Sequence, residues 1–97
     1  MFMTLLRFSD NRAAASEFMA AHNAWIAQGF DDGVFLCVGA LAPAAGGAII
    51  ATGEARADHD ARINADPFVI HDIVTAETHQ IVPKRVTPAL KFLMAQA

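Results

Sequence analysis

The chain has 97 residues, of which 55% are hydrophobic and 18% are charged, and its formal net charge is −3. This length fits one domain, residues 1–97, and excludes a two-domain cleft or a complete dinucleotide-binding fold. The net negative charge does not fit the basic surface that a nucleic-acid-binding protein needs. Because one small core cannot hide so many apolar side chains, we expect the surplus to face a membrane or another protein chain.

The first half of the chain predicts a strand, a helix and a hairpin. Residues 2–8 are mostly apolar and favour a strand. A helix is predicted from about residue 12 to residue 28, with Gly29 closing it, because polar cap residues precede it and an apolar stripe runs along it. Residues 33–41 and 48–54 predict two strands that are joined by a turn rich in proline and glycine.

The predicted hairpin also bears on whether the chain crosses a membrane. A run of 21 residues from Gly33 to Gly53 carries no charge, which is long enough for a spanning helix. However, Pro43 and the glycine pair at 46–47 interrupt the run and break a helix. Acidic residues flank the run in place of basic ones. We therefore expect a hairpin, and no membrane partner.

The second half predicts a helix, a strand and a final short helix. Alanines recur every four residues in the helix at 57–65, so its inner face is expected to be small. The Asp-Pro pair at 66–67 ends this helix. The pattern leaves the form of residues 69–74 open, and residues 75–82 alternate as a strand does. A threonine and a proline at 87–88 then begin the last helix.

The predicted order is β-α-β-β-α-β followed by a C-terminal helix, which is the ferredoxin-like pattern of an α+β protomer. In that layout both helices cover one face of an antiparallel sheet. The strands are nevertheless apolar on both faces, as in residues 34–38 and 48–51. A second subunit's sheet is the simplest cover, so we expect an obligate homodimer that forms through the sheet face.

One histidine and one aspartate are the main candidates for chemistry. His22 follows Phe18 by four residues and precedes Trp25 by three, which places it on or beside the apolar stripe of the first helix. Asp66 ends the second helix. Because the two helices lie side by side in this fold, the carboxylate can fix one ring nitrogen and leave the other as a base. The alternative is a packed structural histidine and an ordinary Asp-Pro turn.

The remaining chemical side chains offer weaker signals. Arg7 stands in an apolar strand, where it can hold an anionic substrate group or pair with Asp66 or Asp72. His59 is expected on the exposed face of the second helix. The histidines lack tight ligand spacing, so we expect no metal and no cofactor.

The lone cysteine and the N-terminus bear on location. Cys37 sits in an apolar strand and is expected to be a buried small hydrophobe. A single cysteine cannot form an intrachain disulfide, and the N-terminal residues lack the features of a signal peptide. A cytoplasmic, reducing location fits both observations.

The chain also resembles the YciI-like (YCII-related) family in the order of several short motifs. These are Leu6-Arg7-Phe8, His22 with Trp25, Gly29, Gly39-Ala40-Leu41 with Gly46-Gly47, Ala65-Asp66-Pro67-Phe68 and Ile81-Val82-Pro83. The resemblance implies a dimeric α/β barrel of ferredoxin-like protomers, with an active site in which His22 and Asp66 pair. Ala40 departs from the family pattern, which has proline in the hairpin motif.

Three hypotheses for the function follow. The first is a small cofactor-independent enzyme of lyase or isomerase type, in which a His22–Asp66 dyad moves protons on a small cyclic or aromatic metabolite, with Arg7 and Trp25 as substrate-binding residues. The second is a non-catalytic accessory dimer that binds a small molecule. The third is a structural scaffold for a larger complex. A relative of the ferredoxin-like monooxygenases is a further enzyme class.

Overall fold

The computed structural model describes residues 1–96, so residue 97 of the expected single domain lies outside the described residues. The strands are β1 (Phe2–Phe8), β2 (Phe35–Leu41), β3 (Gly46–Ala51) and β4 (Val74–Gln80). The helices are η1 (Arg12–Ala14), α1 (Ala15–Asp31), α2 (Arg56–Asn64), α3 (Pro67–Ile70) and η2 (Pro88–Gln96), of which η1 and η2 are 3₁₀ helices.

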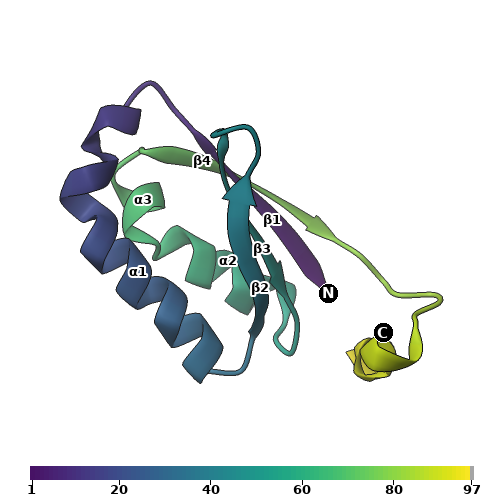
Figure 1. Ribbon diagram of the computed structural model, residues 1–97. Coiled ribbons are helices and arrows are strands. Elements are labelled where there is room, and N and C mark those ends of the chain that lie inside the picture. The colour runs from purple at the N-terminus through teal and green to yellow at the C-terminus, as the bar shows by residue number, and fades with distance from the viewer. Residues whose placement is uncertain (97) are drawn as a thin grey trace.

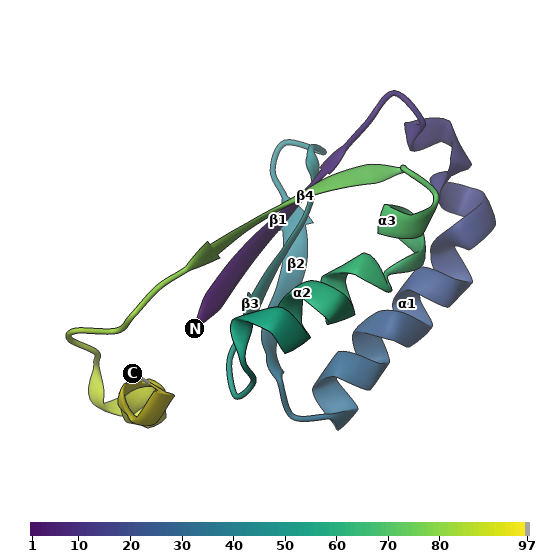
Figure 2. The same cartoon turned by 180° about the vertical axis from the view of Figure 1, so that it is seen from behind.

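The four strands form one antiparallel sheet in the order β2-β3-β1-β4. β1 lies between β3 and β4, so that Leu6 stands opposite Gly47 on one side and Ala76 on the other. Helices α1, α2 and α3 lie together on one face of this sheet (Figures 1 and 2). This mixed α+β architecture is the one expected from the sequence and is compatible with a ferredoxin-like fold.

The core lies between the sheet and the helices. Alternate residues of β1 point into it, beginning with Phe2 and Leu6, which are each 3% exposed. Ile49 of β3, Ile63 of α2 and Phe68 of α3 meet these strand residues in one cluster. Burial of such side chains contributes about 25 cal/mol per Å² of apolar surface, so this cluster fixes the helices on the sheet.

The other face of the sheet has none of the helices α1–α3 on it (Figure 2). It carries Met3 and Leu5 of β1 and Ile50 of β3, all of which are only half-buried. Met3 and Ile50 are paired across the two strands. Cys37 of β2 is exposed, which corrects the expectation of a buried thiol, because it stands beside Ile50 on this same face.

The first helix runs three residues further than expected. Gly29 does not close it, since α1 continues to Asp31 and the turn that follows contains Gly33 at a φ of +75°. Gly29 is instead buried under the ring of Phe35. A Cβ at this position would lie 2.2 Å from Phe35 Cδ2, so only glycine allows the ring to approach.

The second helix presents a different face to the core than expected. His59 and Ile63, four residues apart, are its buried residues, and His59 is 0% exposed. The expectation that His59 lies on the exposed face is therefore wrong. Ile63 is the one large apolar side chain of α2, and packing it inward turns His59 inward as well.

The segment after α2 also takes a form that the sequence left open. Asp66 does end the turn after α2, but it also begins α3 as its N-cap residue, with Pro67 at the first position. In the C-terminal segment Leu93 is 3% exposed, whereas Leu90 and Phe92 are exposed. Within residues 1–96, no helix has the length and apolar character needed to cross a membrane.

Candidate functional site

His22 and Asp66 meet between α1 and α3. His22 Nδ1 lies 2.7 Å from Asp66 Oδ1, the Asp66 side chain is 0% exposed, and the His22 side chain is 13% exposed. An ionised carboxylate only accepts hydrogen bonds, so Nδ1 carries the hydrogen and donates it. In the neutral imidazole the other nitrogen, Nε2, is then unprotonated and able to accept a proton.

Asp66 is held by the same hydrogen bonds that begin α3. Its Oδ1 also accepts a hydrogen bond from the backbone N–H of Phe68 at 3.0 Å. The Phe68 ring stacks on the His22 ring, with 3.9 Å between ring centroids and 2° between planes. The start of α3 thus fixes both the carboxylate and the plane of the imidazole, which is the support that a positioned base needs.

Trp25 holds α1 against α2 rather than facing the cavity. Its Nε1–H donates to the carbonyl oxygen of Arg62 at 3.0 Å. The Arg62 guanidinium in turn pairs with Glu54 and Asp32. Hydrogen bonds from Arg62 and Gln28 lower the pKa of Asp32. Trp25 therefore positions the helix that carries His22 and does not line the cavity described next.

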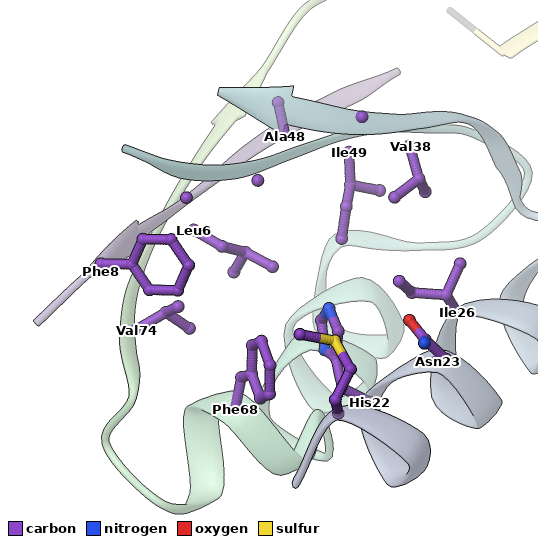
Figure 3. A pocket seen from close by; sticks show the side chains of 14 residues that line it. Leu6, Phe8, His22, Asn23, Ile26, Val38, Ala48, Ile49, Phe68 and Val74 are labelled. Carbon is purple, nitrogen blue, oxygen red and sulfur yellow. The ribbon is translucent and has the colours of Figure 1, made fainter. Parts of the chain in front are cut away.

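A cavity of about 230 Å³ opens beside His22, between α1 and the sheet (Figure 3). One side of it is lined by four residues that lie on the same face of α1: Met19, His22, Asn23 and Ile26. The strands and α3 supply the rest, namely Leu6, Phe8, Val38, Gly39, Gly46, Gly47, Ala48, Ile49, Phe68 and Val74. The volume is below the roughly 300–1,000 Å³ typical of sites for drug-sized ligands, so the cavity suits a smaller molecule.

Polar side chains are scarce in this cavity. His22 and Asn23 carry the only nitrogen or oxygen atoms among the side chains that line it. No lysine, arginine or acidic side chain lines it, because Asp66 is buried behind the imidazole. An apolar chamber with one oriented imidazole favours proton transfer on a small organic molecule, since water competes little there.

Arg7 stands apart from this site. It follows Leu6 in β1 and points to the opposite face of the sheet. Its Nη1 donates to Glu77 Oε2 at 3.1 Å, and both side chains are about half exposed, at 51% and 52%. The expected pairing with Asp66 or Asp72 is not found within residues 1–96, and the structure does not bring Arg7 to the dyad.

Sequence reasoning missed a second polar site, around His59. His59 Nε2 lies 2.8 Å from Thr4 Oγ1, and Thr4 Oγ1 lies 2.8 Å from Thr78 Oγ1. The Phe2 ring stacks on the imidazole at 4.5 Å, and Nδ1 is buried with no hydrogen-bond partner among the described residues. Burial lowers the pKa of His59 below its ordinary value of 6.5. This histidine does not line the cavity.

The other two histidines lie at the surface. His79 Nε2 is 3.1 Å from Glu77 Oε2 and is about half exposed. His71 stacks on Phe18 with 3.8 Å between ring centroids. Within residues 1–96, no three histidine, cysteine, aspartate or glutamate side chains are grouped so that they could hold a metal ion.

The fold and the site together define a small antiparallel α+β protein with a helix-borne His–Asp pair at an apolar cavity. Comparisons with protein-family models, with curated proteins and with solved structures found no match for the chain.

Proposed function

We propose that the protein is a small cofactor-independent enzyme of lyase or isomerase type, in which His22, oriented by Asp66, moves protons on a small cyclic or aromatic metabolite. One observation carries this proposal: the buried carboxylate fixes Nδ1–H at 2.7 Å, while the same imidazole lines an apolar cavity. A purely structural histidine has no need of both features.

The proposed chemistry needs only the residues of this chain. Nε2 takes a proton from a carbon of the bound molecule, and Asp66 stabilises the imidazolium that forms. The electron pair left on the carbon moves into the adjacent unsaturated group. In an isomerisation His22 returns the proton to another carbon, and in an elimination the electron pair forms a double bond as the leaving group departs.

A second candidate is a binding protein that uses the same cavity without chemistry. The observation that favours it is the lining, which is apolar apart from His22 and Asn23. Such a cavity binds small apolar molecules whether or not the imidazole is a base. The two candidates differ in catalysis. Replacement of His22 should abolish the activity of the enzyme, whereas the binding protein has no activity to lose.

We also propose that the chain is a YciI-like protein that acts in the cytoplasm as a homodimer. The half-buried apolar side chains of Met3, Leu5 and Ile50 support a dimer through the face of the sheet opposite α1–α3. Analytical ultracentrifugation of the wild type and of Leu5→Glu tests this. We expect a dimer and a monomer respectively, and a monomeric wild type contradicts the proposal.

Deuterium exchange tests the enzymatic proposal. Cyclohexanone in D₂O is the probe, because its C–H bonds next to the carbonyl are the type that a general base opens, and NMR follows their exchange. General-base catalysis contributes typically about 10²–10⁴-fold, so His22→Ala and Asp66→Asn should lower the protein-catalysed rate by about that factor.

The matched control for this experiment is His79→Ala, the same substitution at a half-exposed histidine outside the cavity. It should leave the exchange rate unchanged. A wild type that does not exceed the buffer rate, or a His22→Ala variant with the wild-type rate, contradicts catalysis and leaves the binding protein as the better account.

A further inference from the structure

Asn23 is the second polar side chain of the cavity, and the proposed chemistry gives it no role. It follows His22 directly and belongs to the stripe of α1 that lines the cavity with Met19 and Ile26. Figure 3 shows its amide beside His22 and Ile26, on the cavity side of the helix. Asn23 is exposed, and no hydrogen bond holds its amide to the other described residues, so the amide is available to a ligand.

The opposite wall offers a ligand surface but no polar side chain. Gly47 of β3 faces the same side of the sheet as Ile49, two residues further on, because side chains alternate along a strand. Leu6 stands opposite Gly47, Val38 stands opposite Ile49, and all four residues line the cavity. The polar atoms of a bound molecule can therefore meet side-chain partners only at the α1 wall, at His22 and Asn23.

The charge of the lining restricts the ligand further. Among residues 1–96, no lysine or arginine side chain lines the cavity, so a phosphate or carboxylate would find no permanently charged partner there, and it would bind only at the expense of the neutral imidazole that acts as the base. A cavity of about 230 Å³ also admits only a small molecule. The lining thus favours a small neutral compound with an apolar body and its polar atoms at one end.

We propose that Asn23 binds the carbonyl oxygen of a small neutral carbonyl compound, whose neighbouring C–H bond faces His22. This inference rests on the proposed function and names its substrate class. The Asn23 Nδ2–H donates to the oxygen. When Nε2 takes the proton from the neighbouring carbon, the C–H electron pair forms the C=C bond of an enolate and the negative charge moves to the oxygen, where the amide stabilises it. Return of the proton reverses each step.

A pair of probes of the same shape tests the contact. Methylenecyclohexane replaces the carbonyl oxygen of cyclohexanone with a CH₂ group, so the two differ chiefly in the ability to accept a hydrogen bond. NMR titration of the labelled protein gives both dissociation constants. The hydrocarbon gains more on leaving water, so the quantity compared is the ratio of its dissociation constant to that of cyclohexanone. A hydrogen bond from Asn23 should raise this ratio about fivefold over that of a protein that lacks the donor.

Three variants test whether Asn23 sets that ratio. Asn23→Leu and Asn23→Asp both remove the donor, and both should lower the ratio about fivefold from its wild-type value. Asn64→Leu makes the same change at an exposed residue of α2 outside this cavity and should keep the wild-type ratio. Because Asn23 is exposed, circular dichroism should show folded proteins throughout.

Two results would overturn the assignment: a wild type that binds neither probe, or Asn23 variants that keep the wild-type ratio. The proposed catalysis can fail separately. A ratio that falls in the Asn23 variants, with a wild type that does not exchange the protons of cyclohexanone, supports the contact and contradicts the enzyme. Exchange that depends on His22, with a ratio that the Asn23 substitutions do not change, supports the enzyme and contradicts the contact.

Discussion

The protein contains two histidine sites, one buried and one largely buried, that are alike in several respects and differ in their partners and surroundings. His22 and His59 each sit on a helix that packs on the sheet, and each ring stacks on a phenylalanine, Phe68 or Phe2. His22 bonds to a carboxylate and lines a cavity. His59 bonds to the hydroxyl of Thr4 and does not line that cavity.

Burial alone would not distinguish the proposed catalytic histidine from the structural one. His59 is the more deeply buried of the two, at 0% exposure, and burial lowers its pKa. A base also needs a partner that stabilises the imidazolium and a path to substrate, and only His22 has both. We therefore expect stability to depend mainly on His59 and chemistry on His22.

The largest effect on stability should come from His59→Ala. The change leaves a cavity beside Phe2 and removes the hydrogen bond to Thr4, and losses of this kind cost about 2–4 kcal/mol of the free energy of unfolding. Urea denaturation measures it. His22→Gln should cost clearly less, because that ring borders a cavity already and the glutamine amide leaves a hydrogen-bond donor beside the buried Asp66 carboxylate. If His22→Gln costs as much as His59→Ala, the proposed division between the two sites is wrong.

Access to His22 can be tested at two neighbouring glycines. A Cβ on Gly47 meets nothing nearer than Gly39 O at 3.4 Å, so Gly47→Ala should fold normally and narrow the cavity, with weaker binding of cyclohexanone. A Cβ on Gly46 lies 1.8 Å from Leu6 O, at a φ of +138°. Gly46→Ala should therefore lower the free energy of unfolding by about 1–3 kcal/mol.

The readouts for the glycine pair are urea denaturation and titration with cyclohexanone. If Gly47→Ala binds the probe as the wild type does, the ligand does not reach this wall. If Gly46→Ala is as stable as the wild type, the backbone of β3 is able to shift away from Leu6.

The pH dependence of stability should identify His59. Its pKa is lower in the folded protein than the ordinary 6.5, so the unfolded chain binds more protons below that pH. The free energy of unfolding should therefore fall as the pH drops through 6.5 and continue to fall until the folded pKa is reached. The negative charges of Glu54 and Asp60 oppose the lowering of the His59 pKa, whereas the positive charges of Arg56 and Arg62 reinforce it.

The variant that checks this assignment is His59→Gln, measured by urea denaturation from pH 7.5 to pH 5. It should show a shallower decline in stability over this range than the wild type. His79→Ala, at the surface, should keep the wild-type decline. An unchanged decline in His59→Gln would assign the pH dependence to other groups.

The smallest effect is expected at Arg7. Its ion pair with Glu77 is about half exposed, and such pairs contribute about 0–1 kcal/mol. Arg7→Ala should leave the free energy of unfolding within about 0.5 kcal/mol of the wild type. Since Arg7 lies on the other face of the sheet from the cavity, the exchange rate should not change. A large loss of exchange would restore Arg7 as a substrate-binding residue.

The sequence predicted the fold well where apolar residues recur at the regular spacing of a strand or a helix. The order of strands and helices and the place of the hairpin are as expected, because the strands read as apolar runs and the first helix as a stripe. Helix α2 was less predictable. Its repeated alanines suggested an inner face, but alanine fits either face, and Ile63 decides the orientation through its larger buried area.

The meeting of His22 and Asp66 was also predictable, since the fold places their helices side by side. The shape of the cavity was not. It depends on Gly47, which has no side chain to fill the space opposite α1, and a glycine in a sequence does not show what its missing side chain would have met. Asn23 was overlooked for a related reason, because its neighbours on the helix read as a core stripe.

The shared oxygen of Asp66 has one more consequence. Oδ1 receives both the imidazole N–H and the first free backbone N–H of α3, so in the proposed enzyme one atom serves both the reaction and the folding of the chain. A substitution at position 66 should therefore change both properties together, and a lineage that abandoned the chemistry would still be selected to keep this aspartate.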